Sequence, residues 1–161
     1  MDRLEPEDNR TPPRADPPKV TNFKSGEVCE RSSAQAVCVE TEAIEIEGKD
    51  RCEFDGQMRR CTWFGFEFDY ENAHPDVKIE CAYTRSHPSN EGNRDGVRER
   101  NATTGTLEVK LPAESGHFVH PMYQLHAVPP AGVAIIISTD LECSYAGHDL
   151  FGVRYDLRFP P

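Results

Sequence analysis

Apolar and polar residues alternate with a period of two along most of the chain after residue 20. In residues 61–70, Phe64, Phe66 and Phe68 fall on one face, while Glu67 and Asp69 fall on the other. This period predicts β-strands with one buried and one solvated face, and no segment shows a helical period of useful length. The alternation is clearest in residues 61–70, 77–83, 106–111, 132–145 and 150–159.

These strands predict an all-β fold in which two antiparallel sheets pack face to face. We expect an antiparallel β-sandwich, a Greek key of immunoglobulin-like or cupredoxin-like type, with one domain over residues 21–161. Residues 1–20 contain five prolines and few apolar side chains, so we expect a disordered, proline-rich tether there. Residues 84–103 are rich in glycine, asparagine and charge, which predicts a long polar loop. Residues 26–37 are compatible with a short helical turn.

Six cysteines, an even number, predict a disulfide-bonded protein. Cys29 and Cys38 are nine positions apart, as are Cys52 and Cys61, and the C-x2-C spacing of zinc sites does not occur. Disulfides persist in oxidising compartments, so we expect a secreted, periplasmic or cell-surface protein. The first ten residues are polar and contain no secretory signal, so we expect that a targeting segment has been removed.

The spacing favours three particular disulfides, although six cysteines allow many connectivities. A type II′ turn at Gly56–Gln57 would place Cys52 directly opposite Cys61, within reach of a disulfide. Cys81 and Cys143 fall on the inward faces of two predicted strands, so a bridge between them would join the two sheets. The favoured set pairs Cys29 with Cys38, Cys52 with Cys61, and Cys81 with Cys143.

The segment CSYAGHDLFGVRYDLRF, which begins at Cys143, resembles the copper loop of azurin-type cupredoxins. In that family a cysteine that ends one strand and a histidine a few residues later bind copper, and the last strand follows. Cys143 and His148 match these positions, with Tyr145 and Gly147 between them. Where the family has its axial methionine, this sequence has Leu150. The resemblance implies copper ligation by Cys143 and His148.

The alternative is that Cys143 lies in a disulfide and His148 is a surface residue. A copper-free relative of the same sandwich would then keep the fold without the metal. We expect no cofactor, with copper as the alternative. The other histidine-rich stretch offers His117, His120 and His126, but the first two fall on opposite faces of a strand, which favours an exposed strand over a zinc site.

The net charge of −10 disfavours a nucleic-acid partner, because an acidic surface repels phosphate backbones. No apolar run approaches the length of a membrane span, so we expect no direct membrane insertion. Nucleophile elbows and phosphate-binding glycine loops do not occur, so we expect that the protein is not an enzyme. Asn101 lies in a glycosylation sequon and is the better of two candidates if the source is eukaryotic.

These features favour an extracytoplasmic binding or assembly module that recognises another protein or a cell-surface component through loops and edge strands. The predicted loop supplies charged and polar side chains, and Trp63 falls on the face opposite the phenylalanines, where an exposed indole would anchor a partner. The alternative is that Trp63 lies in the core and the phenylalanines face a second layer. The candidate binding residues are Trp63, Arg85, Asn90, Arg94 and Arg98.

Overall fold

All the regular structure that the computed structural model describes is β-strand. The description covers residues 16–31, 34–74, 77–93, 98–129 and 132–161. Within these ranges no helix is long and apolar enough to cross a membrane. The strands are β1 Lys19–Arg31, β2 Ala34–Glu40, β3 Ala43–Glu45, β4 Asp50–Phe54, β5 Gln57–Glu71, β6 Lys78–Asn93, β7 Arg98–Lys110, β8 Gly116–Leu125, β9 Ile135–Tyr145 and β10 His148–Phe159.

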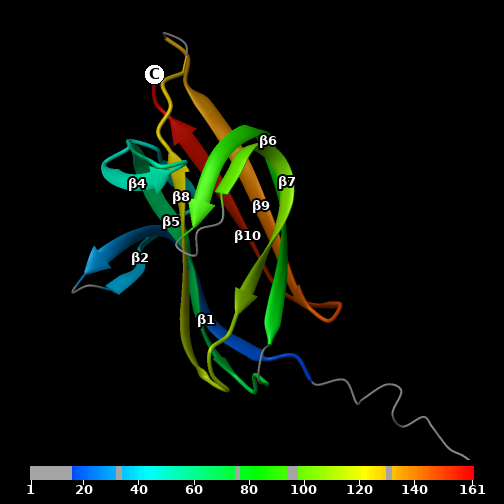
Figure 1. The fold of residues 1–161 in the computed structure, drawn as a ribbon. Helices are drawn as coiled ribbons and strands as arrows, with labels where there is room; N and C mark the ends of the chain where they lie inside the picture. Colours follow the sequence, from blue (N-terminus) through cyan, green and yellow to red (C-terminus); the bar gives the residue numbers. More distant parts are fainter. Residues whose placement is uncertain (1–15, 32–33, 75–76, 94–97, 130–131) are drawn as a thin grey trace, which may run out of the picture.

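The strands form one continuous hydrogen-bonded sheet in the order β2-β1-β5-β8-β6-β9-β10-β3, with β4 on β5 and β7 on β6. The sheet curls because β6 belongs to both of its halves: residues 80–85 pair with β9, and residues 91–93 pair with β8. In Figure 1 the β6–β7 hairpin arches between the half that holds β5 and β8 and the half that holds β9 and β10. The all-β prediction is confirmed, but the sheet is a single curled one in place of two separate sheets.

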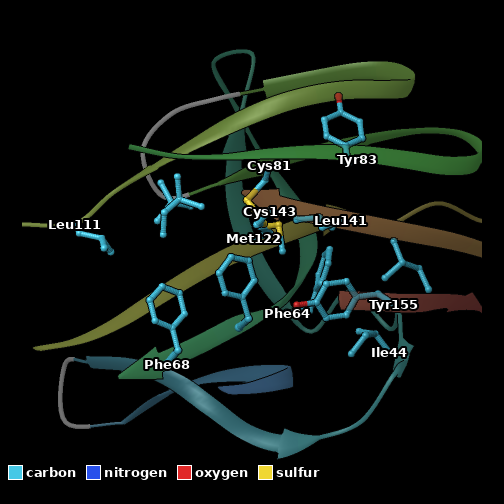
Figure 2. Close-up of a cluster of buried hydrophobic side chains, with 14 of the residues drawn as sticks. Ile44, Phe64, Phe68, Cys81, Tyr83, Leu111, Met122, Leu141, Cys143 and Tyr155 are labelled. Carbon is cyan, nitrogen blue, oxygen red and sulfur yellow. A yellow bond between two sulfur atoms is a disulfide. The ribbon is translucent and has the colours of Figure 1, made fainter. Parts of the chain in front are cut away.

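The main core fills the inside of this curl. Phe64, Phe66 and Phe68 of β5 are fully buried, as the alternation predicted. Figure 2 shows Phe64 next to the ring of Tyr155, with Phe68 farther along β5, and the Cys81–Cys143 disulfide lies in the same core. Each such aromatic ring contributes roughly 1.5–3 kcal/mol through the burial of its side chain.

The five predicted strands are present, but several boundaries differ from the prediction. Lys19 and Val20, at the end of the predicted tether, already belong to β1; residues 1–15 lie outside the described part of the chain. The described residues of 26–37 form strand in place of a helical turn. Much of the predicted loop 84–103 is also strand, because β6 runs to Asn93 and β7 begins at Arg98.

The three disulfides pair as the spacing predicted: Cys29 with Cys38, Cys52 with Cys61, and Cys81 with Cys143. The β4–β5 register is different, however, since Cys52 lies opposite Arg59. The turn falls at Asp55–Gly56, where φ is 53° and 80°, and two positive values specify a type I′ turn in place of type II′.

The third disulfide joins strands that are neighbours in the curled sheet. Cys81 and Cys143 face each other directly in the β6–β9 ladder, with their Cα atoms 4.0 Å apart. Both are buried in the main core. The predicted role of this bridge, to join two separate sheets, is therefore wrong: the bridge links two adjacent strands within the half of the curl where β6 pairs with β9.

Candidate binding pocket

A pocket of about 340 Å³ opens at the end of the molecule that carries the C-terminus (Figure 1). Its volume lies in the range of about 300–1,000 Å³ that small-molecule sites occupy. We call it the end pocket. It lies between the bend of β6, the chain that leaves β8, the start of β9 and the end of β10. Its lining consists of Arg59, His87, Pro88, Ser89, Asn90, Gln124, Leu125, His126, Ala127, Val128, Pro129, Ile135, Ile137 and Phe159.

The inner wall of the end pocket is apolar. Ile135 and Ile137 stand on the inward face of β9, because side chains two residues apart share a face of a strand. Phe159 lies opposite Ile135 in the β9–β10 ladder. Leu125, Ile137 and Phe159 are buried, and Ile135 is half-buried. The wall therefore continues the main core out to solvent.

The polar floor of the end pocket is a closed hydrogen-bond network. The Ser89 hydroxyl donates to Oε1 of Gln124 at 3.1 Å. Nε2 of Gln124 donates to the backbone oxygens of Asn90 at 3.0 Å and of Leu125 at 3.1 Å. Buried amides of this kind are stable only when their hydrogen bonds are satisfied. The network therefore fixes the bend of β6 against the end of β8.

Basic side chains line the opposite side. Arg59 is exposed, and its guanidinium carbon lies 6.0 Å from the centre of the Phe54 ring. The His126 amide donates to the Arg60 carbonyl at 2.9 Å, which holds this segment beside β5. The His126 ring lies over Gly48, where a Cβ atom would come within 2.8 Å of it.

His87 is linked to β9 through the Ser86 hydroxyl. The Ser138 amide donates to the Ser86 hydroxyl oxygen at 2.9 Å, and that oxygen lies 2.9 Å from Nδ1 of His87. If the hydroxyl uses its own hydrogen to reach Nδ1, the ring hydrogen of neutral His87 is on Nε2. The pocket can therefore accommodate an apolar group beside donors for a hydrogen-bond acceptor.

A larger cleft of about 750 Å³ lies between β7 and β8. Its charged lining residues, Glu108 and Lys110, have opposite signs, and Thr106 and Asn93 add neutral polar groups. This mixture does not select for the charge of a ligand, whereas no described residue that lines the end pocket is acidic.

Of the predicted binding residues whose side chains the structure describes, only Asn90 reaches the end pocket. Trp63 is half-buried and packs edge-on against Tyr123, with the ring centres 5.1 Å apart, on a smaller cluster outside the main curl. The phenylalanines fill the main core, while Trp63 packs on the smaller cluster at the other face of β5. Arg98 begins β7, and Arg94 lies outside the described residues.

Arg85 is buried and unavailable to a partner. Only 6% of it is exposed, and its Nη2 and Nε donate to the Glu91 carboxylate at 2.6 and 2.8 Å. The guanidinium also lies 4.0 Å from the centre of the Tyr83 ring. Burial, together with a hydrogen bond to Glu99, raises the pKa of Tyr83 to about 12. Arg85 is therefore a structural residue at the bend of β6, and its predicted role as a binding contact is not supported.

The disulfide occupies the sulfur atom that the copper alternative requires. Copper binding of the cupredoxin type needs the Cys143 thiolate, and that sulfur is bonded to Cys81. His148 is exposed at the start of β10, where it pairs with Tyr145 across a tight turn. In the described ranges, no group of three or more His, Cys, Asp or Glu side chains is arranged to hold a metal ion.

The outer face of β5 and β8 carries a separate charged cluster. Nδ1 of His117 lies 2.7 Å from Asp69, and its Nε2 lies 2.7 Å from Glu67. Because carboxylates only accept hydrogen bonds, the ring satisfies both contacts when both nitrogens are protonated. The hydrogen bond to Asp69, and then that to Glu67, raise the pKa of His117. The other oxygen of Glu67 accepts the Val37 amide at 2.7 Å, so this cluster fastens β2 to the sheet.

No protein-family model matches the chain, and no curated protein matches it significantly. Among solved structures, an immunoglobulin-like protein from Pseudomonas aeruginosa aligns over 89% of this chain and 98% of its own, with 16% identity and a TM-score of 0.53. The fold is immunoglobulin-like. The N-terminal domain of PorA aligns over 83% of this chain and 96% of its own, with 12% identity and a TM-score of 0.37. An immunoglobulin-like fold with three disulfides is typical of extracellular or periplasmic proteins.

Proposed function

We propose that this protein is an extracytoplasmic, non-catalytic recognition module built on an immunoglobulin-like fold, and that the end pocket is its binding site. The three disulfides support the compartment, and the fold is one that commonly presents ligands at the end of its sheets. The partner is a cell-surface component or another protein that places an apolar group in the end pocket.

The apolar character of the mouth carries this proposal. Val128 lines the end pocket and is 81% exposed, although most large apolar side chains of the described chain are covered. Ile135 extends the same apolar surface inward. An exposed apolar patch that continues into a lined cavity is typical of a ligand-binding site.

The neutral dye N-phenyl-1-naphthylamine tests this site, since its fluorescence rises in an apolar environment. We expect saturable binding to the wild-type protein. We also expect at least about tenfold weaker binding to Ile135→Asp, because an aspartate in the wall must lose its hydration when the dye enters. Val128→Asp changes an exposed residue that the fold does not need, so it provides a second variant that keeps its structure.

Ile136→Asp is the matched control, because Ile136 is 50% exposed and stands on the opposite face of β9 from Ile135. It should bind the dye as the wild type does. Equal binding by all four proteins, or no saturable binding by the wild type, would overturn the proposed site.

A further inference from the structure

We infer that the ligand of the end pocket is an anionic amphiphile, with an alkyl or acyl tail against Ile135, Ile137 and Phe159 and a carboxylate head group beside Arg59 and His87. This inference rests on the proposed function and names the class of ligand. It follows from the distribution of charge in the pocket and from the placement of its hydrogen-bond donors.

The charge of the lining is opposite to that of the molecule. The chain has 28 acidic and 18 basic residues. Among the described residues of the pocket lining none is acidic, and Arg59 carries a positive charge. A site that carries one sign of charge raises the local concentration of ligands of the other sign. Within an acidic protein, this mouth therefore favours an anion and disfavours a cation.

Arg59 is in a position to bind a carboxylate. It is exposed, and among the described residues no acidic side chain lies within ion-pairing distance of it. Its contact is with the Phe54 ring, which steadies the guanidinium without neutralising it. The planar guanidinium presents two parallel N–H groups that match the two oxygens of a carboxylate.

His87 supplies a second donor on the side of the β6 bend. When the Ser86 hydroxyl, which accepts the Ser138 amide, donates its own hydrogen to Nδ1, the ring hydrogen of His87 lies on Nε2 and points to a ligand as a donor. By contrast, Gln124 uses its carbonyl and amide within the floor of the pocket and offers the head group little. The lining of one cavity therefore contains both hydrogen-bond donors and an apolar wall, which is the combination that an amphiphile requires.

Three ligands with the same eight-carbon tail test the head group: octanoate, octan-1-ol and octylammonium. Each is titrated into the oxidised full chain and detected by displacement of N-phenyl-1-naphthylamine. We expect octanoate to bind about tenfold more tightly than octanol, and octylammonium to bind most weakly. In Arg59→Gln the preference for octanoate over octanol should fall several-fold, while octanol binding stays unchanged.

Arg51→Gln is the matched control, since Arg51 is exposed on the same β4–β5 hairpin and does not line the pocket. It should keep the wild-type preference for octanoate. Equal binding of octanoate and octanol, or tighter binding of octylammonium, would overturn the anionic head group while the dye result still supports the pocket. If neither the dye nor any octyl ligand binds, the proposed function itself fails.

Discussion

On the outer face of β5 and β8, hydrogen bonds between single residues set the charge state of the cluster formed by His117, Asp69 and Glu67. His117 lies between two carboxylates, and its pKa is raised above 6.5 by its hydrogen bonds to Asp69 and Glu67. This contribution to stability is fully present below pH 6.5 and is lost as the pH rises through the folded-state pKa. The pKa of Asp69 is lowered from 3.8 by hydrogen bonds from Asn22 and His117, so its contribution is present above about pH 4 and is lost at more acidic pH.

We therefore predict that His117→Gln lowers the melting temperature more at pH 5.5 than at pH 8.5, because the imidazolium contributes only on the acidic side. Thermal unfolding followed by circular dichroism at both pH values measures the difference. His148→Gln, which changes an exposed histidine elsewhere on the surface, provides the control. A loss in His117→Gln that is the same at both pH values would contradict the charged pair.

The buried pair of Arg85 and Glu91 also acts at the scale of residues. Burial raises the pKa of Glu91, and the guanidinium of Arg85 opposes this by favouring the carboxylate. We predict that Glu91→Gln lowers the free energy of unfolding by roughly 3–5 kcal/mol, because it leaves Arg85 charged and unpaired in the interior. The double change Arg85→Met with Glu91→Leu should cost much less. Urea unfolding measures the free energy of unfolding of the single variants and of the double variant. A loss in the double variant as large as the summed losses of the single variants would rule out the coupling between Arg85 and Glu91.

At the scale of elements, the predictions succeeded where one strand carries its own pattern. Residues 61–70 and 150–159 show a period of two because one face of each strand packs on the main core, although Phe151 and Val153 are only half-buried. The end of β6 has no such pattern: its sequence HPSNEGN is typical of a loop, yet it forms strand because β7 and β8 supply hydrogen-bonding partners from other parts of the chain. The composition of a segment indicates its local preference for strand or loop, but it does not indicate which distant strands will form hydrogen bonds with it.

The disulfides allow a prediction at this scale. Removal of the Cys81–Cys143 bridge, which closes a separation of 62 residues inside the core, should cost about 4 kcal/mol. Removal of the half-buried Cys29–Cys38 bridge, with a separation of 9, should cost no more than about 3 kcal/mol. Urea unfolding of the two paired Cys→Ala variants gives the comparison. A larger loss of unfolding free energy in the variant without the Cys29–Cys38 bridge than in the variant without the Cys81–Cys143 bridge would contradict this prediction.

At the scale of the whole molecule, the end pocket could not be predicted from the sequence. Its walls come from β5, the bend of β6, the end of β8, the start of β9 and the end of β10, and the curl of the sheet alone brings them together. Asn90 was identified only because it lies in a polar segment. The disulfides could be predicted because two pairs are local and the remaining two cysteines lie on inward faces.

The central claim is that an apolar ligand group enters the end pocket. The most direct test is a methyl NMR titration of isoleucine-labelled protein with octan-1-ol. We expect saturable shifts at the methyl groups of Ile135 and Ile137, which line the pocket, with those of Ile44 and Ile79 unchanged in the main core. Unchanged Ile135 and Ile137 signals at saturating octanol, or shifts confined to other isoleucines, would contradict the claim.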